Sequence, residues 1–167
     1  MHQVALLYPR GYNVWQRKCY VAKPKKQKGI ICYRIINAEP VPVWFGIKTP
    51  RDFYGEKIDI KSFDAVYREF KPDVLHLHTL MGLPMEVLKY FKEKGVRIVF
   101  SSHDFFGICP KINLIDLDGN LCNEVTTEKC IMCNKNAPST LFLKSINSEI
   151  VYIIKSFMKW IKNLKRC

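Results

Sequence analysis

A histidine–aspartate pair and four cysteines lie close together in this sequence. The segment HDFFGICPKINLIDLDGNLCNEVTTEKCIMC begins at His103 and contains Cys109, Cys122, Cys130 and Cys133. A neutral imidazole can hydrogen-bond a hydroxyl group or a developing negative charge. Four thiolates can hold Zn²⁺ tetrahedrally, and a Cys-x-x-Cys pair lets one tight turn supply two of the ligands. The segment therefore offers two kinds of chemistry side by side.

The four cysteines have two interpretations. A structural Zn²⁺ bound by Cys109, Cys122, Cys130 and Cys133 would only brace the loop, because four protein ligands leave no open position for chemistry. Alternatively, Cys109 is a small buried hydrophobic residue and the other three are reduced thiols without a role. The long spacing of the first pair is unusual for a zinc ribbon, so the sequence leaves both interpretations open.

The composition predicts one ordinary folded domain. The chain has 167 residues, of which 48% are hydrophobic, enough for a real core. The opening residues MHQVALLYPR lack the charged region, the apolar length and the cleavage site of an export signal. The sequence also lacks the ~18 unbroken apolar residues that a membrane helix needs. We therefore expect a cytoplasmic protein whose seven cysteines are reduced.

The formal net charge of +12 indicates the kinds of partner. Nucleic acid, an anionic membrane surface and phosphate-bearing substrates are all compatible with it. One basic cluster, KPKKQK at 23–28, is interpreted as a solvated turn. A second cluster lies in the C-terminal segment.

The elements that must position these residues follow from apolar patterns. Strands are predicted over 3–9, 29–37, 74–80 and 96–104, and helices over 59–73 and 83–95. A strand, a helix and a strand at this spacing form a βαβ unit with a parallel sheet. Ligands of such sheets bind beyond the carboxyl ends of the strands.

Polar residues occupy two of those carboxyl ends. One predicted strand ends on His76, His78 and Thr79, and the other ends on His103 and Asp104. Side-chain alternation directs His76 and His78 to the same face of the strand, where one of them could simply be a core residue.

The C-terminal segment 139–167 is predicted to be a basic amphipathic helical tail. One stripe is apolar, and it consists of Ile146, Ile150, Ile153, Phe157, Ile161 and Leu164. A second stripe is basic, and it consists of Lys155, Lys159, Lys162 and Arg166. The helix could pack on the sheet, or residues 144–167 could contact an anionic membrane surface.

The block KPDVLHLHTLMGLPMEVLKYFKEKGVRIVFSSHDFFGICPKINLIDLDGNLC, residues 71–122, resembles the N-terminal domain of family 4 glycosyltransferases. The shared pattern is Pro-Asp-Val-x-His-x-His, a helix, a strand ending in His-Asp and two aromatic residues, and then Cys-Pro, Asp-x-x-Gly and Cys. The resemblance covers roughly residues 2–135. These enzymes have the two-domain GT-B fold.

The resemblance implies an α/β fold, a Rossmann-like three-layer parallel sheet with helices on both faces. Residues 1–138 would form this partial N-terminal domain, and 105–135 a cysteine-rich loop inserted in it. The family transfers a sugar from a nucleotide-sugar donor to a saccharide or lipid-linked acceptor in glycan synthesis, at the inner face of the membrane. The N-terminal domain holds the acceptor.

The resemblance also assigns roles to individual residues. His103 matches a family histidine that lies in the cleft near the sugar and phosphates of the donor, so it is the expected catalytic residue. His78, Thr79 and Asp104 are expected to bind substrate.

The chain also departs from the family. The family has a first strand followed by a glycine-rich loop, and this chain has no counterpart of it. The family also has a donor-binding half with two glutamates separated by seven residues, and this chain has no such pair. We therefore expect a glycosyltransferase piece truncated at both ends and inactive alone. The missing strand would be central in the sheet, so its neighbours would have unpaired edges.

Two other functions remain open. The chain could be a non-catalytic partner that docks on a separate donor-binding chain. It could also be a zinc-stabilised nucleic-acid-binding module, as the charge and the cysteines suggest. Nucleic acid is the less expected partner, because the basic residues form no stripe with interleaved aromatic residues.

Overall fold

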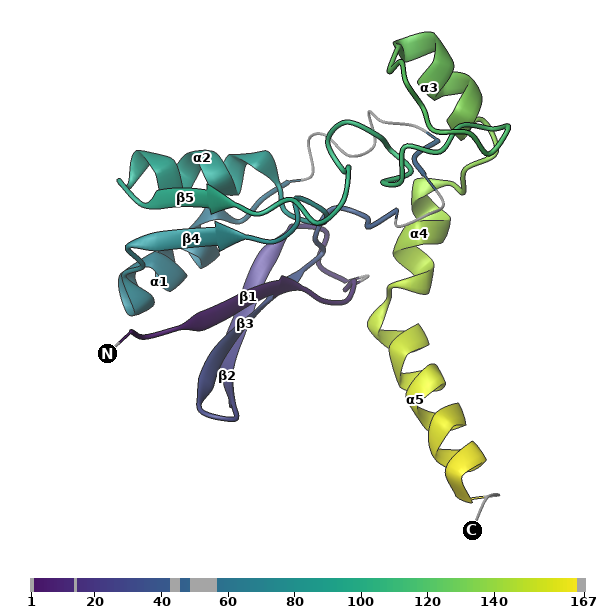
Figure 1. Ribbon diagram of the computed structural model, residues 1–167. Helices are drawn as coiled ribbons and strands as arrows, with labels where there is room; N and C mark the ends of the chain where they lie inside the picture. The colour runs from purple at the N-terminus through teal and green to yellow at the C-terminus, as the bar shows by residue number, and fades with distance from the viewer. Residues whose placement is uncertain (1, 14, 43–45, 49–56, 165–167) are drawn as a thin grey trace.

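The structure is a computed structural model that describes residues 2–13, 15–42, 46–48 and 57–164. Its strands are β1 (Ala5–Pro9), β2 (Tyr20–Gln27), β3 (Ile30–Ile36), β4 (Val74–Leu77) and β5 (Arg97–Phe100). Its helices are α1 (Ile60–Phe70), α2 (Met85–Glu93), α3 (Thr127–Asn134), α4 (Thr140–Ile146) and α5 (Glu149–Leu164). The chain is therefore a mixed α/β protein (Figure 1). None of the described helices is long and apolar enough to span a membrane.

The first sheet has the strand order β1-β3-β2, and it corrects the interpretation of the basic cluster 23–28. Those residues form most of β2, which pairs antiparallel with β3, so the sheet is mixed and not wholly parallel. β2 is an edge strand, where lysines are common because they discourage pairing with another chain. The register shifts between Ala22 and Lys25, around Pro24, which lacks the N–H that a regular ladder needs.

A two-residue turn joins β2 to β3. Both central residues, Lys28 and Gly29, have positive φ angles, of 48° and 84°. This is the pattern of the type I′ turn, whose twist matches that of a β-hairpin. The cluster that was predicted to be only a turn therefore supplies a strand as well as the turn.

The second sheet consists of β4 and β5, which pair in parallel as predicted, with Leu75 opposite Ile98 and Leu77 opposite Phe100. Among the described residues, β1 and β4 each pair along one edge only. A cavity of about 600 Å³ lies between these two strands, whose arrows point the same way in Figure 1. The two sheets are thus separated by an apolar groove bordered by two open strand edges.

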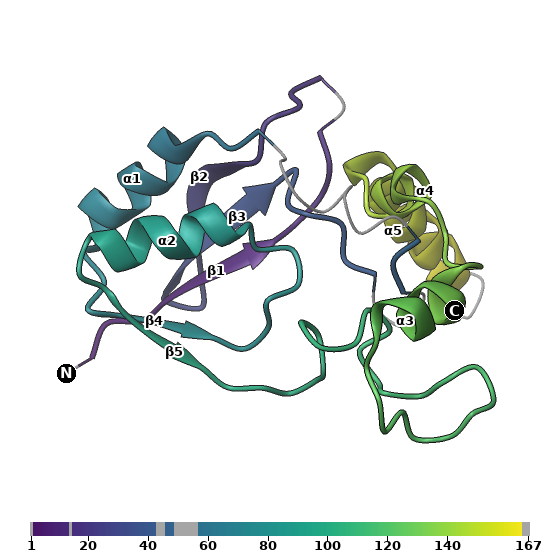
Figure 2. The ribbon, with the colours of Figure 1, turned by 90° about the horizontal axis from the view of Figure 1, so that it is seen from above.

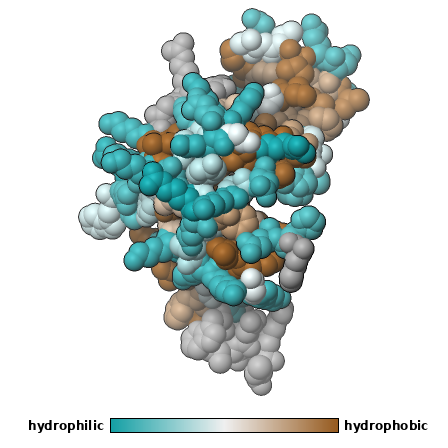
Figure 3. Space-filling view, turned by 90° about the vertical axis from the view of Figure 1, so that its left-hand side faces the viewer, coloured by the Kyte–Doolittle hydropathy of each residue, from teal (hydrophilic) through white to brown (hydrophobic). Residues whose placement is uncertain are grey.

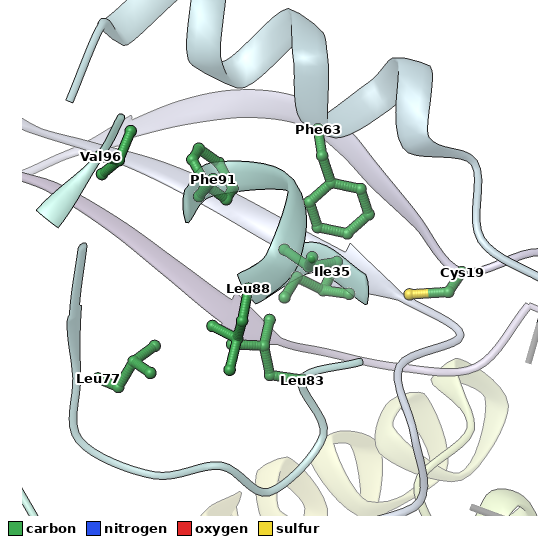
Figure 4. Packing of buried hydrophobic residues seen from close by; sticks show 9 residues of the cluster. Cys19, Ile35, Phe63, Leu77, Leu83, Leu88, Phe91 and Val96 are labelled. Atoms are coloured by element: carbon green, nitrogen blue, oxygen red, sulfur yellow. The ribbon is translucent and has the colours of Figure 1, made fainter. Parts of the chain in front are cut away.

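Helices α1 and α2 pack on one face of the sheets (Figure 2). Phe63 of α1 and Phe91 of α2 are almost fully buried there, together with Ile35 of β3 and Leu77 of β4 (Figure 4). Both helices lie where they were predicted, within one or two residues at most boundaries. On the strands, Leu6, Val74 and Val99 remain 41% or more exposed. The expected arrangement of helices on both faces is therefore not confirmed.

The remaining helices lie beyond one end of the sheets (Figure 1). Helix α3 lies inside the segment 105–135, which was expected to be a loop. The expected C-terminal helix is two helices, α4 and α5, because the chain turns at Asn147 and Ser148. Of its basic stripe, Arg166 lies outside the described residues. The side of the molecule that faces the viewer in Figure 3 is mostly hydrophilic, with smaller hydrophobic patches among the hydrophilic residues.

Candidate functional site

Three histidines gather at the carboxyl ends of β4 and β5. Nδ1 of His78 lies 3.0 Å from Nε2 of His103, within hydrogen-bonding distance. The ring of His76 is next to that of His78, with 4.3 Å between the ring centres. The rings of His78 and His103 are stacked at 5.3 Å, with 14° between their planes. The predicted catalytic residue His103 and the predicted substrate-binding residue His78 are thus in contact.

The parallel sheet brings these residues together. Ser101 donates its N–H to the carbonyl of Leu77, so backbone pairing continues one residue past β5. This hydrogen bond keeps the carboxyl ends of β4 and β5 side by side. His76 and His78 are two residues apart and do lie on the same face, as alternation predicted. Both are exposed, so neither is the core residue that was considered as an alternative.

The hydrogen bond between His78 and His103 defines what the pair presents to a ligand. One of the two facing nitrogens must carry a proton and the other must not. When both rings are neutral, the two outward nitrogens, Nε2 of His78 and Nδ1 of His103, are therefore one donor and one acceptor in either tautomer. When one ring takes up a proton, both outward nitrogens become donors. The neutral pair suits a hydroxyl group, and the charged pair suits an anion.

Thr79 and Asp104, the other two predicted substrate-binding residues, flank the histidines. The hydroxyl of Thr79 accepts the N–H of Met81 at 3.1 Å. One carboxylate oxygen of Asp104 accepts the N–H of Phe106 at 2.8 Å. In these contacts both side chains fix the loops that follow β4 and β5.

His76 and Ser101 belong to the same group but were not among the predicted site residues. Nε2 of His76 lies 2.8 Å from the hydroxyl of Ser101, which links the two strands on the histidine side. The alternating pattern of His76 and His78 was the signal for the first of them. The partnership with Ser101 depends on the strand register, which the sequence does not display.

The four predicted metal ligands surround one small cavity, of about 20 Å³. Cys130 and Cys133 are three residues apart on α3, so they lie on the same side of the helix, in place of the expected tight turn. Cys109 and Cys122 reach the cavity from the preceding loop. The four are not joined by disulfides. Burial, and then the nearby thiols of Cys109, Cys122 and Cys133, raise the pKa of Cys130.

An aspartate shapes the loop between Cys109 and Cys122. One carboxylate oxygen of Asp116 accepts the N–H groups of Asp118 and Asn120, at 3.0 and 2.9 Å. An isolated bridge between Ile115 and Leu121 closes the same turn. The turn thus brings the two separated cysteines back to one place.

The donor set fits Zn²⁺, because four gathered thiols are ligands that this ion prefers. The sulfur atoms of two of these cysteines, however, point at backbone carbonyl groups and not at a common centre. Cys122 donates to the carbonyl of Glu124 at 3.1 Å, and Cys133 points at the carbonyl of Ile115. In the described part of the chain, no group of three or more His, Cys, Asp or Glu residues is placed to hold a metal. Zinc therefore stays a prediction.

Comparison with known proteins gives one partial similarity. No family model matches the chain, and no solved structure matches it. An uncharacterized 42.6 kDa protein in the cps region of Klebsiella pneumoniae is 32% identical to this chain over 63 residues. The match covers 38% of this chain and 17% of that protein.

Proposed function

We propose that this chain is the acceptor-side domain of a glycosyltransferase that builds cell-surface polysaccharide. The observation that carries the proposal is the contact between His78 and His103 at the carboxyl ends of two parallel strands, where such sheets bind ligands. The similarity to a protein of the cps region in Klebsiella pneumoniae supports the polysaccharide part.

The chemistry of the histidine pair matches sugar transfer. The acceptor hydroxyl oxygen bonds to the anomeric carbon of the donor sugar, and the bond from that carbon to the phosphate oxygen breaks. The hydroxyl proton goes to the outward acceptor nitrogen of the neutral pair, and the outward donor nitrogen hydrogen-bonds the departing phosphate. In this proposal His103 acts at the reacting groups, and its hydrogen bond with His78 couples the tautomers of the two rings.

The donor nucleotide sugar would be bound by a unit outside these residues. The groove between β1 and β4 supports this view, because its two edges lack strand partners among the described residues and its lining is largely apolar. A strand inserted there would pair on both sides and join the two sheets. The same groove would also suit a non-catalytic role, in which the chain docks on a separate donor-binding chain.

A membrane surface is the proposed place of the reaction. Ile150, Ile153 and Ile154 of α5 are 58%, 65% and 50% exposed, although they are apolar. The exposed residues Lys155 and Lys159 lie on the same helix. An exposed helix with apolar and basic residues binds at the interface of anionic lipid, where a lipid-linked acceptor is held.

Deletion and complementation test the proposed function. Removing the gene from its source cell should lower the amount of surface polysaccharide, and the wild-type gene should restore it. The variant His103→Gln should restore little of it, while the control variant His2→Gln, which alters an exposed histidine that precedes β1, should act like the wild type. Normal polysaccharide after deletion, or full complementation by His103→Gln, would contradict the proposal.

A further inference from the structure

A second cavity, separate from the histidines, lies between helix α5 and the ends of β1 and β3. Its volume is about 460 Å³, within the range of ~300–1,000 Å³ that is usual for ligand sites. Arg10 follows β1, Arg34 lies on β3 and Lys155 lies on α5, and all three line the cavity. One carboxylate, that of Glu149, lines it too. Three cations therefore share this cavity with a single acidic residue.

These cations are not neutralised within the described residues. Neither Arg10, Arg34 nor Lys155 forms an ion pair with a described carboxylate. Nε of Arg34 is buried and has no hydrogen-bond partner. A buried charged donor without an acceptor is unfavourable by more than ~1–3 kcal/mol, so the described residues leave the charge of Arg34 uncompensated.

Arg10 is held in a defined position. Its guanidinium lies 4.7 Å above the ring centre of Tyr152 on α5. A hydrogen bond with Tyr8 raises the pKa of Arg10 and keeps it charged. The side chain thus spans the space between the strand end and the helix, with limited freedom to move away from the cavity.

Gly11 permits α5 to approach the strand end so closely. Its φ angle is +77°, and a Cβ atom there would lie 2.7 Å from Cγ of Glu149. Any other residue would be strained at this φ and would push the first turn of α5 outward. The wall of the cavity therefore depends on this glycine.

We propose that this cavity binds a phosphate group, as a phosphomonoester or diphosphate. Guanidinium groups bind phosphate oxygens through charged and often paired hydrogen bonds, and Arg10 and Arg34 both line this cavity. The phosphate can come from a lipid headgroup or from a free compound. Ile153, which lines the cavity and is 65% exposed, would suit a lipid chain leaving the site. Assignment to a lipid-linked acceptor rests on the proposed function, but phosphate binding does not.

Calorimetric titration with inorganic pyrophosphate tests the site on the full chain. Arg34→Gln and Arg10→Gln should each weaken binding about tenfold or more, because each removes a charged hydrogen bond. The control Arg97→Gln removes the same charge from an exposed position at the start of β5 and should change affinity less than about twofold. Circular dichroism checks folding, and Arg10→Gln decides the matter if Arg34→Gln does not fold.

Vesicles separate the two sources of phosphate. If pyrophosphate displaces the chain from vesicles of phosphatidylglycerol, and Arg34→Gln binds them weakly, the site takes a lipid phosphate. If only pyrophosphate binding depends on Arg34, the site takes a free phosphate compound. The proposal is overturned if neither ligand shows such dependence, or if Arg97→Gln weakens binding as much as Arg34→Gln. A failed complementation test with intact pyrophosphate binding would overturn only the glycosyltransferase role.

Discussion

The exposed apolar side chains of α5 give the most direct test of membrane contact. Replacing Ile150 and Ile154, one turn apart on the helix, with serine should weaken binding to vesicles. Full burial of an isoleucine side chain is worth ~1.5–3 kcal/mol. The two residues are 58% and 50% exposed, so binding to the membrane can still bury about half of each side chain, worth ~0.8–1.5 kcal/mol each. The double variant should thus lose ~1.5–3 kcal/mol, about 10- to 150-fold in affinity.

Sedimentation with vesicles of phosphatidylglycerol and phosphatidylcholine measures this affinity. A matched control replaces Leu117 and Leu121 of the cysteine-rich segment with serine, because they are also strongly exposed, at 57% and 71%. The control should bind within about twofold of the wild type. If the α5 variant binds as the wild type does, or if the control loses as much, the helix is not the contact surface, and the net charge of +12 alone explains any binding.

The remaining predictions concern the histidines, the cysteines and the partly buried Tyr90. With the donor-binding unit present, His103→Gln should lower the rate of sugar transfer about 100-fold or more. In this chain it should change the free energy of unfolding by less than ~1 kcal/mol, because the histidines are exposed. The purified chain should contain about one zinc, and Cys130→Ser should lose most of it, as measured by elemental analysis. Burial and a hydrogen bond to Asp64 raise the pKa of Tyr90 to about 12, so stability should fall between about pH 10 and 12, where the unfolded chain loses this proton first. Tyr90→Phe should remove that fall, as measured by urea unfolding.

Each of these predictions has an opposing result. A large loss of stability in His103→Gln would indicate a structural role. A metal-free protein with normal thermal stability would favour the reduced-thiol interpretation of the cysteines, and Cys32→Ser serves as the control because Cys32 lies on β3, away from the cavity. Equal alkaline stability of Tyr90→Phe and the wild type would refute the raised pKa of Tyr90.

Local patterns explain why part of the fold was predictable. Phe63 and Val66 follow the helical period and are buried in α1, which ends where Lys71 takes a positive φ before Pro72. Alternation on β4 was enough to put His76 and His78 on one face. These features involve residues a few positions apart, whose relative placement follows from the geometry of a single helix or strand.

Pairing between distant segments was not predictable in the same way. The lysines of β2 gave no alternating signal, and only the ladder with β3 identifies them as a strand. α3 was missed because Cys130 and Cys133 have the spacing of a metal-binding turn as well as that of one helical turn.

The sequence by itself determined α1 and α2, most of the strands and the residue types at the strand ends. Only the tertiary structure decided that His78 and His103 touch, that four cysteines meet at one cavity, and that Arg10 and Arg34 share another with α5. The physical reason is that hydrophobic periodicity is a pattern of residues close together in the sequence. Strand register, helix packing and the clustering of charged groups depend on contacts between residues far apart in the sequence.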